Sequence, residues 1–574
     1  MDHDPTAGLR DLFEAVHGGE DDAVVRLLRA GVPAEATDFD GTSALYAAAV
    51  NDRPGTVRSL LAAGADPDRA CGPEGGDLPL CAAAVGGHTE VVRALLAAGA
   101  RPDLREEYGF TALTWAAGRG HASTVAELLA HGADPDLPGP GGESALVLAA
   151  RRGSPATVRA LLRHRAVDRK AALAEARGWL ESDVEHAVRR RLQQLYGVRQ
   201  GDAFAARRVV EEGGTTLVVE LLRDGIPVAS EEQQTGHAAV VTRLECVVGV
   251  RTPAAELVER AVRSGNPEGN DWREAVAALW QRADEETFRA ARSWCARDTT
   301  PSGFLHQTFA ADVLARVGAR DAAVPLLREL AAREGSVCLT RAAVRALGRH
   351  GDAVGVLGRV GHPDAGVRER VARALGRVGF AEPAVDALIV LARDGDLGVR
   401  GAAVEGLARA VENGVVSDPV REVLAEQVGA GALGRGGAEE VGAGGAGWAG
   451  AEQGAPGAER AAPLARPSRP RGAAPPPKGG GAESGAAEGD GVGSGVATGG
   501  GEGRGALAVG DPVYAEAARG LAACQDPRAV SALWRVLVDG EPGSPAHRIA
   551  RDALVHVQDE KVRRRLEWTS PRLR

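Results

Sequence analysis

The chain has 574 residues and a formal net charge of −10, from 68 basic and 78 acidic side chains. An acidic balance gives no bulk attraction to nucleic acid or to anionic lipid, so we expect neither a nucleic-acid nor a membrane partner. Apolar residues make up 44% of the chain and aromatic residues only 3%, which leaves Ala, Val, Leu and Gly to fill the core. That mix favours closely packed helices over a sandwich or barrel, which needs more aromatic and β-branched residues.

Cysteine usage and hydropathy narrow the class of protein further. The six cysteines are scattered without a CxxC pair, so the sequence indicates neither a zinc site nor a disulfide framework. The first residues lack a basic stretch followed by an apolar core, and no run of 18 apolar residues occurs. We therefore expect neither a signal peptide nor a membrane span, and we predict a cytoplasmic location.

A pair of adjacent leucines recurs along the first third of the chain. The first leucines of successive pairs lie 33, 35, 33 and 33 residues apart, and a second ladder of single leucines has the same four spacings. Self-similarity at a fixed period is the signature of a repeat architecture, so we predict a solenoid here. The pairs begin at Leu27, Leu60, Leu95, Leu128 and Leu161, and the second ladder is Leu12, Leu45, Leu80, Leu113 and Leu146.

The fourth unit indicates how each repeat is built. Leu113, Ala116 and Ala117 fall at i, i+3 and i+4, which places them on one face of a first helix. A second apolar face follows over 125–129, and Gly132 supplies the left-handed residue that ends a helix. The Asp-Pro pair that comes next prevents helix continuation and starts an extended loop.

These repeats resemble the ankyrin family over residues 8–166. The segment 109–136, GFTALTWAAGRGHASTVAELLAHGADPD, follows the family pattern almost in full. The resemblance implies helix pairs joined by extended loops. The family carries a His in the first helix that usually ties adjacent loops together, and its absence here leads us to expect somewhat looser loops. That position is occupied by Tyr46, Cys81, Thr114 and Val147, and the less regular copies are 41–68, 76–103 and 142–166.

Residues 167–300 are less regular, and we interpret them as a helical connector. The stretch 213–230 is compatible with a strand pair or with another helix. The segment TGHAAVVTRLE resembles an ankyrin second helix, so we predict a degenerate ankyrin repeat at 235–250. The helices predicted in the connector cover 169–196, 253–264 and 271–297.

A different repeat begins near residue 302. Its pattern, D-x-x-V-R-x-x-A-x-x-A-L-G, is clearest at 364–379, where Val367, Val371 and Leu375 share one helical face. The pattern resembles the HEAT-like repeats of the bilin-lyase superfamily. This resemblance implies an α-solenoid, which we assign to residues 302–428 and again to 511–570.

The segment 429–510 separates the two HEAT-like stretches. It is dominated by Gly, Ala, Pro and Glu, and from residue 430 it lacks Phe, Tyr, Ile and Met. Such a segment has too little apolar surface to offset the entropy of ordering its backbone. We therefore predict a disordered Gly/Ala/Pro-rich insertion, in which the basic run 466–478 fits a solvated linker better than a ligand for a partner groove.

No group of residues indicates catalysis. His88 and His121 each follow a Gly and begin a helix, which fits a structural role. Some HEAT-like proteins hold two irons through repeated His-Glu pairs, but none of the 13 histidines here precedes a Glu. The Gly-rich runs are not followed by the GKS or GKT of a phosphate-binding loop. We therefore expect no catalytic residue, metal or cofactor, and predict that the protein is not an enzyme.

Aromatic residues near the expected loop tips and inner helices of the ankyrin array are the candidate partner-binding residues. In the family, the position of Trp115 on the inner helix tends to face the groove, and Trp is a preferred interface anchor. The alternative is a Trp that is half-buried between neighbouring inner helices. The four candidates are Phe39, Tyr108, Phe110 and Trp115.

The sequence thus predicts an all-α protein in which an ankyrin solenoid is joined through a helical connector to a HEAT-like solenoid. The resemblance implies a non-catalytic scaffold or adaptor that binds a protein or peptide through the concave surfaces of both solenoids. A HEAT-like lyase-type enzyme or enzyme subunit is the alternative. Nucleic-acid binding through arginines of the HEAT groove is weaker still, because of the acidic balance.

We expect limited proteolysis to cut the chain first within 430–510, because that segment has few large apolar residues. Deleting most of it should barely change the melting temperature, since loop closure costs only roughly 0.6 kcal/mol per doubling of loop length. Mass spectrometry of the first fragments and calorimetry of the deletion variant test both statements. A sharp fall in melting temperature would mean that the segment is ordered.

Overall fold

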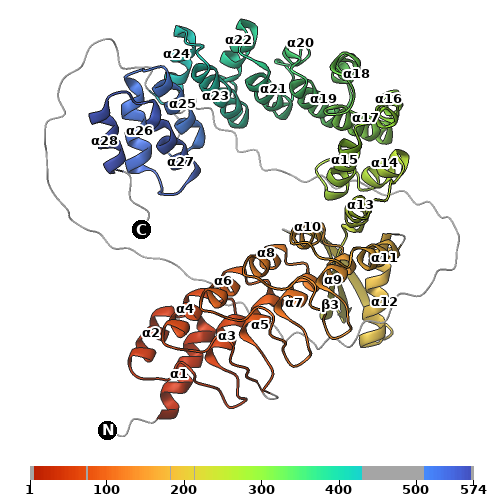
Figure 1. Ribbon diagram of the computed structural model, residues 1–574, viewed down its shortest axis with the longest axis vertical. Coiled ribbons are helices and arrows are strands. Elements are labelled where there is room, and N and C mark those ends of the chain that lie inside the picture. The colour runs from red at the N-terminus through yellow and green to blue at the C-terminus, as the bar shows by residue number, and fades with distance from the viewer. Residues whose placement is uncertain (1–4, 73–74, 181, 212–213, 430–509, 570–574) are drawn as a thin grey trace. The chain divides into compact units, whose positions relative to one another are not determined.

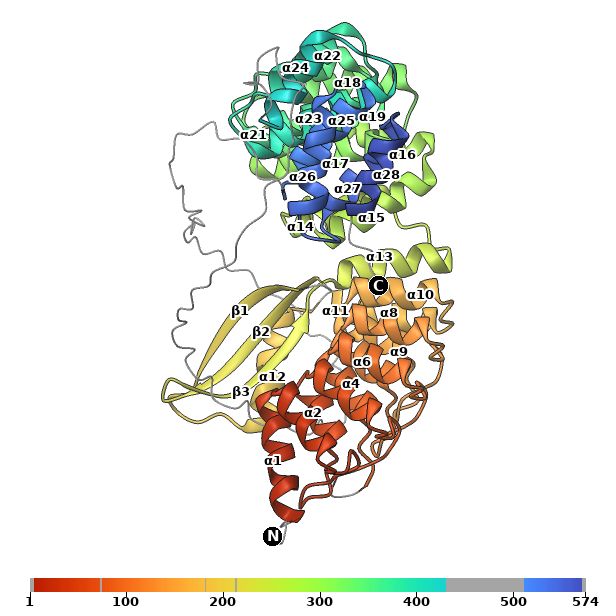
Figure 2. The ribbon, with the colours of Figure 1, turned by 90° about the vertical axis from the view of Figure 1, so that its left-hand side faces the viewer.

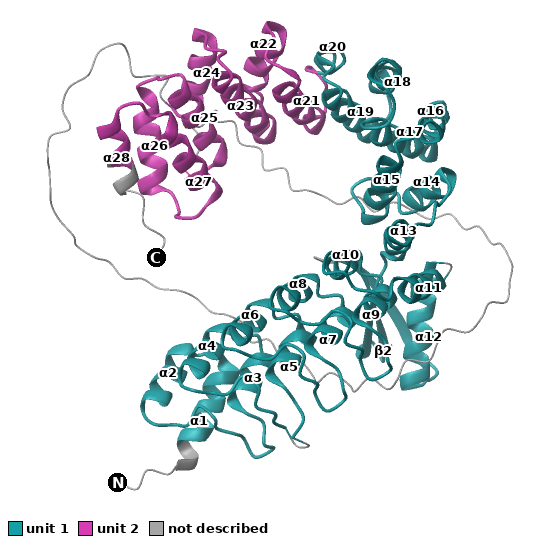
Figure 3. Ribbon diagram, in the orientation of Figure 1, with its two compact units in different colours: residues 1–359 teal, residues 360–574 magenta. Residues whose placement is uncertain are grey.

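The computed structural model describes residues 5–72, 75–180, 182–211, 214–429 and 510–569. It forms two compact units, which we call the N-terminal unit (1–359) and the C-terminal unit (360–574) (Figure 3). The described part of the chain is mostly helical, as predicted. Residues 430–509 of the predicted disordered insertion lie outside the described residues.

Helices α1 to α10 follow one another in pairs at the start of the N-terminal unit (Figure 1). Odd-numbered helices pack against odd-numbered neighbours and even-numbered helices against even-numbered ones, which produces two layers. The bounds are α1 Pro5–Gly18, α2 Asp21–Arg29, α3 Ala44–Val50, α4 Pro54–Ala62, α5 Pro79–Gly86, α6 Thr89–Ala97, α7 Ala112–Arg119, α8 Ala122–Ala130, α9 Ala145–Arg152 and α10 Pro155–Arg163.

The core of these pairs runs between the two layers without a break. All five single leucines of the second ladder are buried, as are the first leucines of four of the five pairs; Leu27 is partly buried against the same core. Alanines fill the contacts between odd-numbered helices, where Ala83, Ala84, Ala116 and Ala117 are fully buried. Their small side chains let neighbouring helices approach closely, which is why an aromatic-poor sequence can still form a dense core.

Histidines bind two of these helix pairs to the preceding one. The imidazole Nε2 of His88 lies 3.1 Å from the carbonyl oxygen of Val50, and that of His121 lies 3.0 Å from the carbonyl oxygen of Val85. Burial lowers the pKa of His121, so the neutral ring donates its Nε2–H to the carbonyl. The role of these two side chains is therefore structural, as their place after a Gly predicted.

Aspartates supply a second set of bonds between repeats. The Asp68 carboxylate accepts from the backbone N–H of Arg101 at 3.0 Å, and Asp103 accepts from the N–H of Asp134 at the same distance. Because each bond links a loop to the next loop along the array, the loops are joined without the family's histidine. The carboxylates give these backbone N–H groups, which lie outside the helices, an acceptor within the protein.

The connector is not purely helical, which corrects our prediction for 167–300. Three antiparallel strands in the order β1-β2-β3 lie between α12 and α13, and α12 packs on β2 and β3 (Figure 2). The turn between β2 and β3 contains Asp224 and Gly225, which have φ of 51° and 79°. An Asp-Gly pair that adopts positive φ at both residues is the preferred two-residue hairpin turn. The bounds are α11 Arg169–Leu180, α12 Val184–Tyr196, β1 Ala203–Glu211, β2 Gly214–Arg223, β3 Ile226–Gln234 and α13 His237–Val248.

Helix α11 precedes this sheet in the sequence and α13 follows it, yet the two helices pack against each other. Helix α11 also packs on α9, as α9 packs on α7. Nε2 of His237, the first residue of α13, lies 3.1 Å from the carbonyl oxygen of Arg151 and repeats the bond made by His88 and His121. Burial lowers the pKa of His237 to about 4, so its ring is neutral. The degenerate repeat at 235–250 remains a prediction, which these contacts support.

The remaining helices of the N-terminal unit again form two layers. Helices α13, α15, α17 and α19 pack in succession in one layer, and α14, α16 and α18 pack in the other (Figure 1). The helix predicted over 271–297 is two helices, which separate at Ala283, where φ is 45°. The bounds are α14 Ala254–Arg263, α15 Asn270–Arg282, α16 Glu285–Cys295, α17 Pro301–Leu314, α18 Arg320–Ala332, α19 Val337–Arg349 and α20 Ala353–Leu357.

The C-terminal unit repeats this construction. Helices α21, α23, α25 and α27 pack in succession, so α25 follows α23 in space as α23 follows α21. Gly376 and Gly406 allow α21 and α23 to approach closely, since a Cβ on Gly376 would lie 3.0 Å from the Cα of Gly406. The bounds are α21 Ala365–Val378, α22 Glu382–Leu391, α23 Leu397–Glu412, α24 Asp418–Gln427, α25 Pro512–Ala523, α26 Arg528–Asp539, α27 Pro545–Asp552, the 3₁₀ helix η1 Ala553–His556 and α28 Glu560–Thr569.

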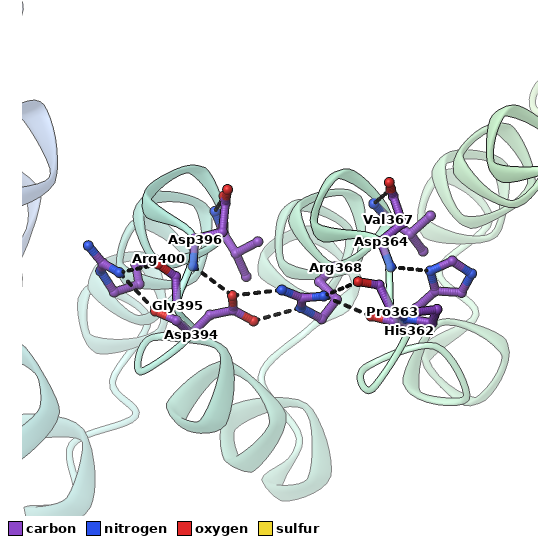
Figure 4. A network of polar contacts seen from close by, with 10 residues as sticks. His362, Pro363, Asp364, Val367, Arg368, Asp394, Gly395, Asp396 and Arg400 are labelled. Atoms are coloured by element: carbon purple, nitrogen blue, oxygen red, sulfur yellow. Dashed lines mark hydrogen bonds and ion pairs between the residues drawn. The ribbon is translucent and has the colours of Figure 1, made fainter. Parts of the chain in front are cut away.

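The D-x-x-V-R pattern has a structural explanation in this unit (Figure 4). Asp364 begins α21 by accepting the N–H of Val367 at 2.8 Å, and Val367 is fully buried. The Arg368 guanidinium donates to both carboxylate oxygens of Asp394, at 2.7 and 2.9 Å. It also donates to the carbonyl oxygens of His362 and Pro363, each at 2.9 Å. The Arg therefore joins its own loop to the next one.

The same arrangement recurs one repeat later. Asp396 accepts the N–H of Val399 at 3.0 Å, and Arg400 donates to the carbonyl oxygens of Asp394 and Gly395 at 2.9 and 3.0 Å. The Arg368 guanidinium lowers the pKa of the Asp394 carboxyl below its usual range. In each copy of the pattern, the Asp caps a helix, the Val fills the core and the Arg donates to loop carbonyl oxygens.

Arg368→Ala should destabilise α21 and α23 locally by about 1–3 kcal/mol, because it leaves a mostly buried carboxylate and two loop carbonyls without their donor. Amide hydrogen exchange of the two helices measures this local free energy directly. Arg373→Ala is the matched control, since Arg373 is on the same helix but makes only an exposed pair with Glu369. That control should change exchange by less than about 0.5 kcal/mol. Equal effects of the two substitutions would contradict the structural role of Arg368.

Candidate functional site

The structure brings two of the four predicted partner-binding residues into contact. The rings of Phe110 and Trp115 are stacked, with centroids 4.2 Å apart and an interplanar angle of 28°. Tyr108 belongs to the same loop as Phe110 and is 47% exposed. Phe39 is 96% exposed but lies two loops earlier in the array, so it is separate from the other three. We call Tyr108, Phe110 and Trp115 the aromatic cluster.

A buried carboxylate shapes the loop that carries the cluster. Glu106 is 8% exposed, and its Oε1 accepts the backbone N–H groups of Tyr108 and Phe110 at 3.1 and 3.4 Å. Burial raises the pKa of Glu106, whereas hydrogen bonding acts in the opposite direction. One carboxylate thus fixes the part of the loop that carries Tyr108 and Phe110.

Helix α7 fixes the position of Trp115. It begins with a capping box, in which the Thr114 N–H donates to the Thr111 hydroxyl at 3.2 Å and the Thr111 N–H donates to the Thr114 hydroxyl at 2.9 Å. Thr114 stands where the family has its histidine, so this repeat uses that position to start the helix. Trp115 follows directly and is partly buried against the core.

Trp115 belongs to a row of equivalent positions on successive odd-numbered helices. The row consists of Ala47, Ala82, Trp115 and Leu148, which are 35, 33 and 33 residues apart. Ala82, Trp115 and Leu148 are partly exposed. The indole is the largest side chain of the row, and part of its surface remains accessible.

Polar groups border this row at the end of α9. The Arg151 guanidinium pairs with Glu143 and, at 2.8 Å, with Glu175. The Gln233 side-chain amide at the end of β3 donates to the carbonyl oxygens of Arg151 and Arg152, at 2.9 and 2.7 Å. The end of β3 is therefore hydrogen-bonded to the last turn of α9, the helix that carries Leu148 of the row.

Sequence reasoning missed Glu106 and the contact of Gln233 with α9. The sequence does offer a signal for Glu106. An acidic side chain just before a turn can accept the backbone N–H groups of that turn, and Glu106 precedes Gly109 and Phe110. No local signal marks Gln233, because its partners lie about 80 residues earlier in the chain.

The described residues offer little for catalysis. Among them, no group of three or more His, Cys, Asp or Glu side chains is arranged to hold a metal ion. Burial raises the pKa of the Cys81 and Cys295 thiols, the latter to about 12, so both stay protonated near neutral pH. A thiol in that state is a poor nucleophile. No helix of the described part is long and apolar enough to cross a membrane.

Family models match two parts of the chain. The model for ankyrin repeats, three copies long, matches residues 12–106 and 80–172. The model for HEAT repeats matches residues 333–408 and 355–430. The chain carries ankyrin repeats and HEAT repeats. None of the curated proteins matches it in sequence. The ankyrin repeats contain the aromatic cluster, and both repeat types are generally protein-interaction scaffolds.

Glu106→Ala should open the loop of the aromatic cluster, because the backbone N–H groups of Tyr108 and Phe110 lose their acceptor. We expect the free energy that protects the Tyr108 and Phe110 amides from hydrogen exchange to fall by about 1–3 kcal/mol. Glu106→Gln is the matched control, since its amide oxygen can still accept and should retain most of the protection. Unchanged exchange in Glu106→Ala would show that the carboxylate does not shape the loop.

Proposed function

We propose that the protein is a non-catalytic scaffold or adaptor that binds a protein or peptide partner through the concave surfaces of its ankyrin and HEAT repeats. The observation that carries this proposal is the aromatic cluster of the ankyrin repeats. Its members are held in place by Glu106 and by the capping box of α7, while Tyr108 and part of Trp115 stay accessible. Partner binding through Phe39, two loops away, belongs to the same proposal.

The physical properties of the cluster support this assignment. Aromatic side chains bury a large area on binding and lose little conformational entropy when they are already fixed. The Phe110–Trp115 stack fixes two of the rings, and the bonds of Glu106 fix the backbone at Tyr108 and Phe110, before a partner arrives. A preorganised aromatic anchor at the surface of a repeat array is typical of a binding site for protein.

Trp115→Ala should weaken partner binding by about thirtyfold, because truncation of an aromatic anchor costs on the order of 2 kcal/mol. The partner is first isolated by affinity purification with the full chain from the native cell and identified by mass spectrometry. Its affinity for the purified variants is then measured by calorimetry, and the melting temperature of each variant is recorded alongside.

Trp534→Ala is the matched control, because Trp534 on α26 is 43% exposed and lies outside the ankyrin repeats. It should leave the affinity unchanged. A Trp115→Ala variant with full affinity but a collapsed melting temperature would assign Trp115 to the core and remove it from the binding surface. In that case its loss would cost roughly 3–5 kcal/mol of stability.

A further inference from the structure

Strand β1 forms a free edge of the sheet in the connector. Figure 2 shows it on one side of β2, with β3 on the other side. It pairs with β2 from Ala203 to Glu211 without a bulge. In an antiparallel pair, every second residue points its N–H and C=O groups away from the partner strand. Within the part of the chain that the structure describes, no group outside β2 forms a hydrogen bond with the backbone of β1.

The opposite edge of the sheet, along β3, is already attached to the ankyrin array. The Arg152 guanidinium donates to the carbonyl oxygen of Glu232, and the Gln233 side chain donates to the end of α9. Helix α12 packs on β2 and β3, and Phe204 of β1 packs against the same buried residues. A further strand can therefore join the sheet at β1 without displacing a hydrogen bond, whereas at β3 it cannot.

Strand β1 lacks most of the features that protect an exposed strand edge from pairing. It is nine residues long and contains neither Pro nor Gly. Its pairing with β2 has no bulge that would twist the edge away, and Val210 is 85% exposed beside the free backbone. A long regular edge of this kind is a template for another extended segment. The one protective feature left is the charge of three side chains, Arg207, Arg208 and Glu211.

Two adjacent arginines determine the charge at the middle of this edge. Neighbouring residues of a strand point to opposite faces, so Arg207 and Arg208 place one guanidinium on each face of the sheet. The Arg207 side chain is 61% exposed and lies 4.0 Å from Glu220 of β2. Arg208 is exposed, and no carboxylate of the described residues pairs with it.

The acidic groups around β1 do not neutralise the middle of the edge. Glu211 is exposed at the end of the strand and accepts from the Thr216 hydroxyl at 2.5 Å. The edge is therefore basic at its middle and acidic at its end. The other acidic groups of the sheet and of α12 already have basic partners, which are Arg223 for Asp202 at 3.3 Å, Arg189 for Glu185 at 2.5 Å, Arg191 for Glu231 at 3.6 Å and Arg152 for Glu232 at 3.7 Å.

We propose that β1 binds an extended segment of a protein partner that carries two consecutive acidic residues, and that this segment joins the sheet as a fourth strand. The backbone of the segment pairs with the outer N–H and C=O groups of β1. Its two acidic side chains point to opposite faces, so each lies opposite one arginine, Arg207 or Arg208. This site is independent of the aromatic cluster, and it specifies a conformation and a charge that the scaffold proposal does not.

The same charges disfavour a second copy of this chain as the occupant. A two-fold antiparallel pair that uses all of β1 places Arg207 opposite the same residue of the second copy. Like charges directly opposite each other destabilise a sheet. A register centred on Val209 places Arg207 opposite Glu211 instead, but it uses only the last part of the strand. An acidic segment can pair along the whole edge and replaces the repulsion with attraction.

The test uses the full-length protein and a fluorescein-labelled peptide that alternates Val and Thr around a central Glu-Glu pair. Binding is followed by fluorescence anisotropy. One control peptide has Gln-Gln at its centre, and the other is the Glu-Glu peptide N-methylated throughout, which keeps the charge but has no N–H to donate. We expect the Gln-Gln peptide to bind about tenfold more weakly and the N-methylated peptide not to bind. Alternate amides of β1 should become protected from hydrogen exchange in the complex.

Arg208→Glu should weaken binding of the Glu-Glu peptide by about tenfold, because it turns an attraction across the strands into a repulsion. Arg190→Glu is the matched control, since Arg190 is exposed on α12 and its reversal changes the net charge equally without altering the edge. It should bind the peptide like the unaltered protein, as should Trp115→Ala. In a double variant, Arg207→Glu with Arg208→Glu, a Lys-Lys peptide should bind as the Glu-Glu peptide binds the unaltered protein.

Four results would overturn the proposal. Equal binding of the N-methylated peptide would mean that charge alone attracts the segment, and an equal loss in Arg190→Glu would mean that this charge is diffuse. Unprotected β1 amides in the complex would place the peptide elsewhere on the protein. A dimer in light scattering that Glu211→Arg separates would assign the edge to a second copy of the chain. None of these results bears on binding through Trp115.

Discussion

Each helix pair of this protein has an apolar stripe that only the next pair can cover. In the N-terminal unit the resulting core continues without interruption from Leu12 in α1 to Leu244 in α13. Each contact is local, so stability builds up from nearest-neighbour interfaces and not from a single centre. The small side chains at the ankyrin interfaces follow from that requirement, since Ala at a helix contact lets the neighbouring helices approach closely.

Polar bonds between repeats follow the same period as the core. His88, His121 and His237 each bind a carbonyl near the end of the first helix of an earlier repeat, and Asp68 and Asp103 bind backbone N–H groups of the following loop. In the C-terminal unit, Arg368 and Asp394 perform the corresponding task. Because these bonds satisfy loop groups locally, an insertion disturbs only its own repeat. This explains how the sheet can lie between α11 and α13 while those helices still pack together.

The period also determines where functional side chains can gather. Only one side of each helix is needed for packing, so equivalent positions on the other side align in rows about one repeat apart. Trp115 belongs to one such row. Burying acidic groups requires partners, and Asp312 obtains them from Trp272 and Arg345.

Much of this architecture is determined by the sequence alone. The leucine ladders, the Gly after four of the five second helices and the D-x-x-V-R pattern each specify a local helix pair, because period and helix ends are properties of neighbouring residues. The sequence also marked Trp115 as a candidate, from its place in a single repeat. The Asp224-Gly225 pair indicates a hairpin turn, although the apolar residues on either side of it fit a helix equally well.

Tertiary structure decided what depends on residues far apart in the chain. The stack of Phe110 on Trp115, the attachment of Gln233 to α9, and the approach of Arg316 and Arg349 to Trp280 require helices or loops to meet. Trp280 and Arg349 are 69 positions apart in the sequence, and no residue near either of them indicates that they meet. Periodicity predicts which face of a helix is buried, but the contacts across that face depend on how closely neighbouring helices pack, which only the folded chain specifies.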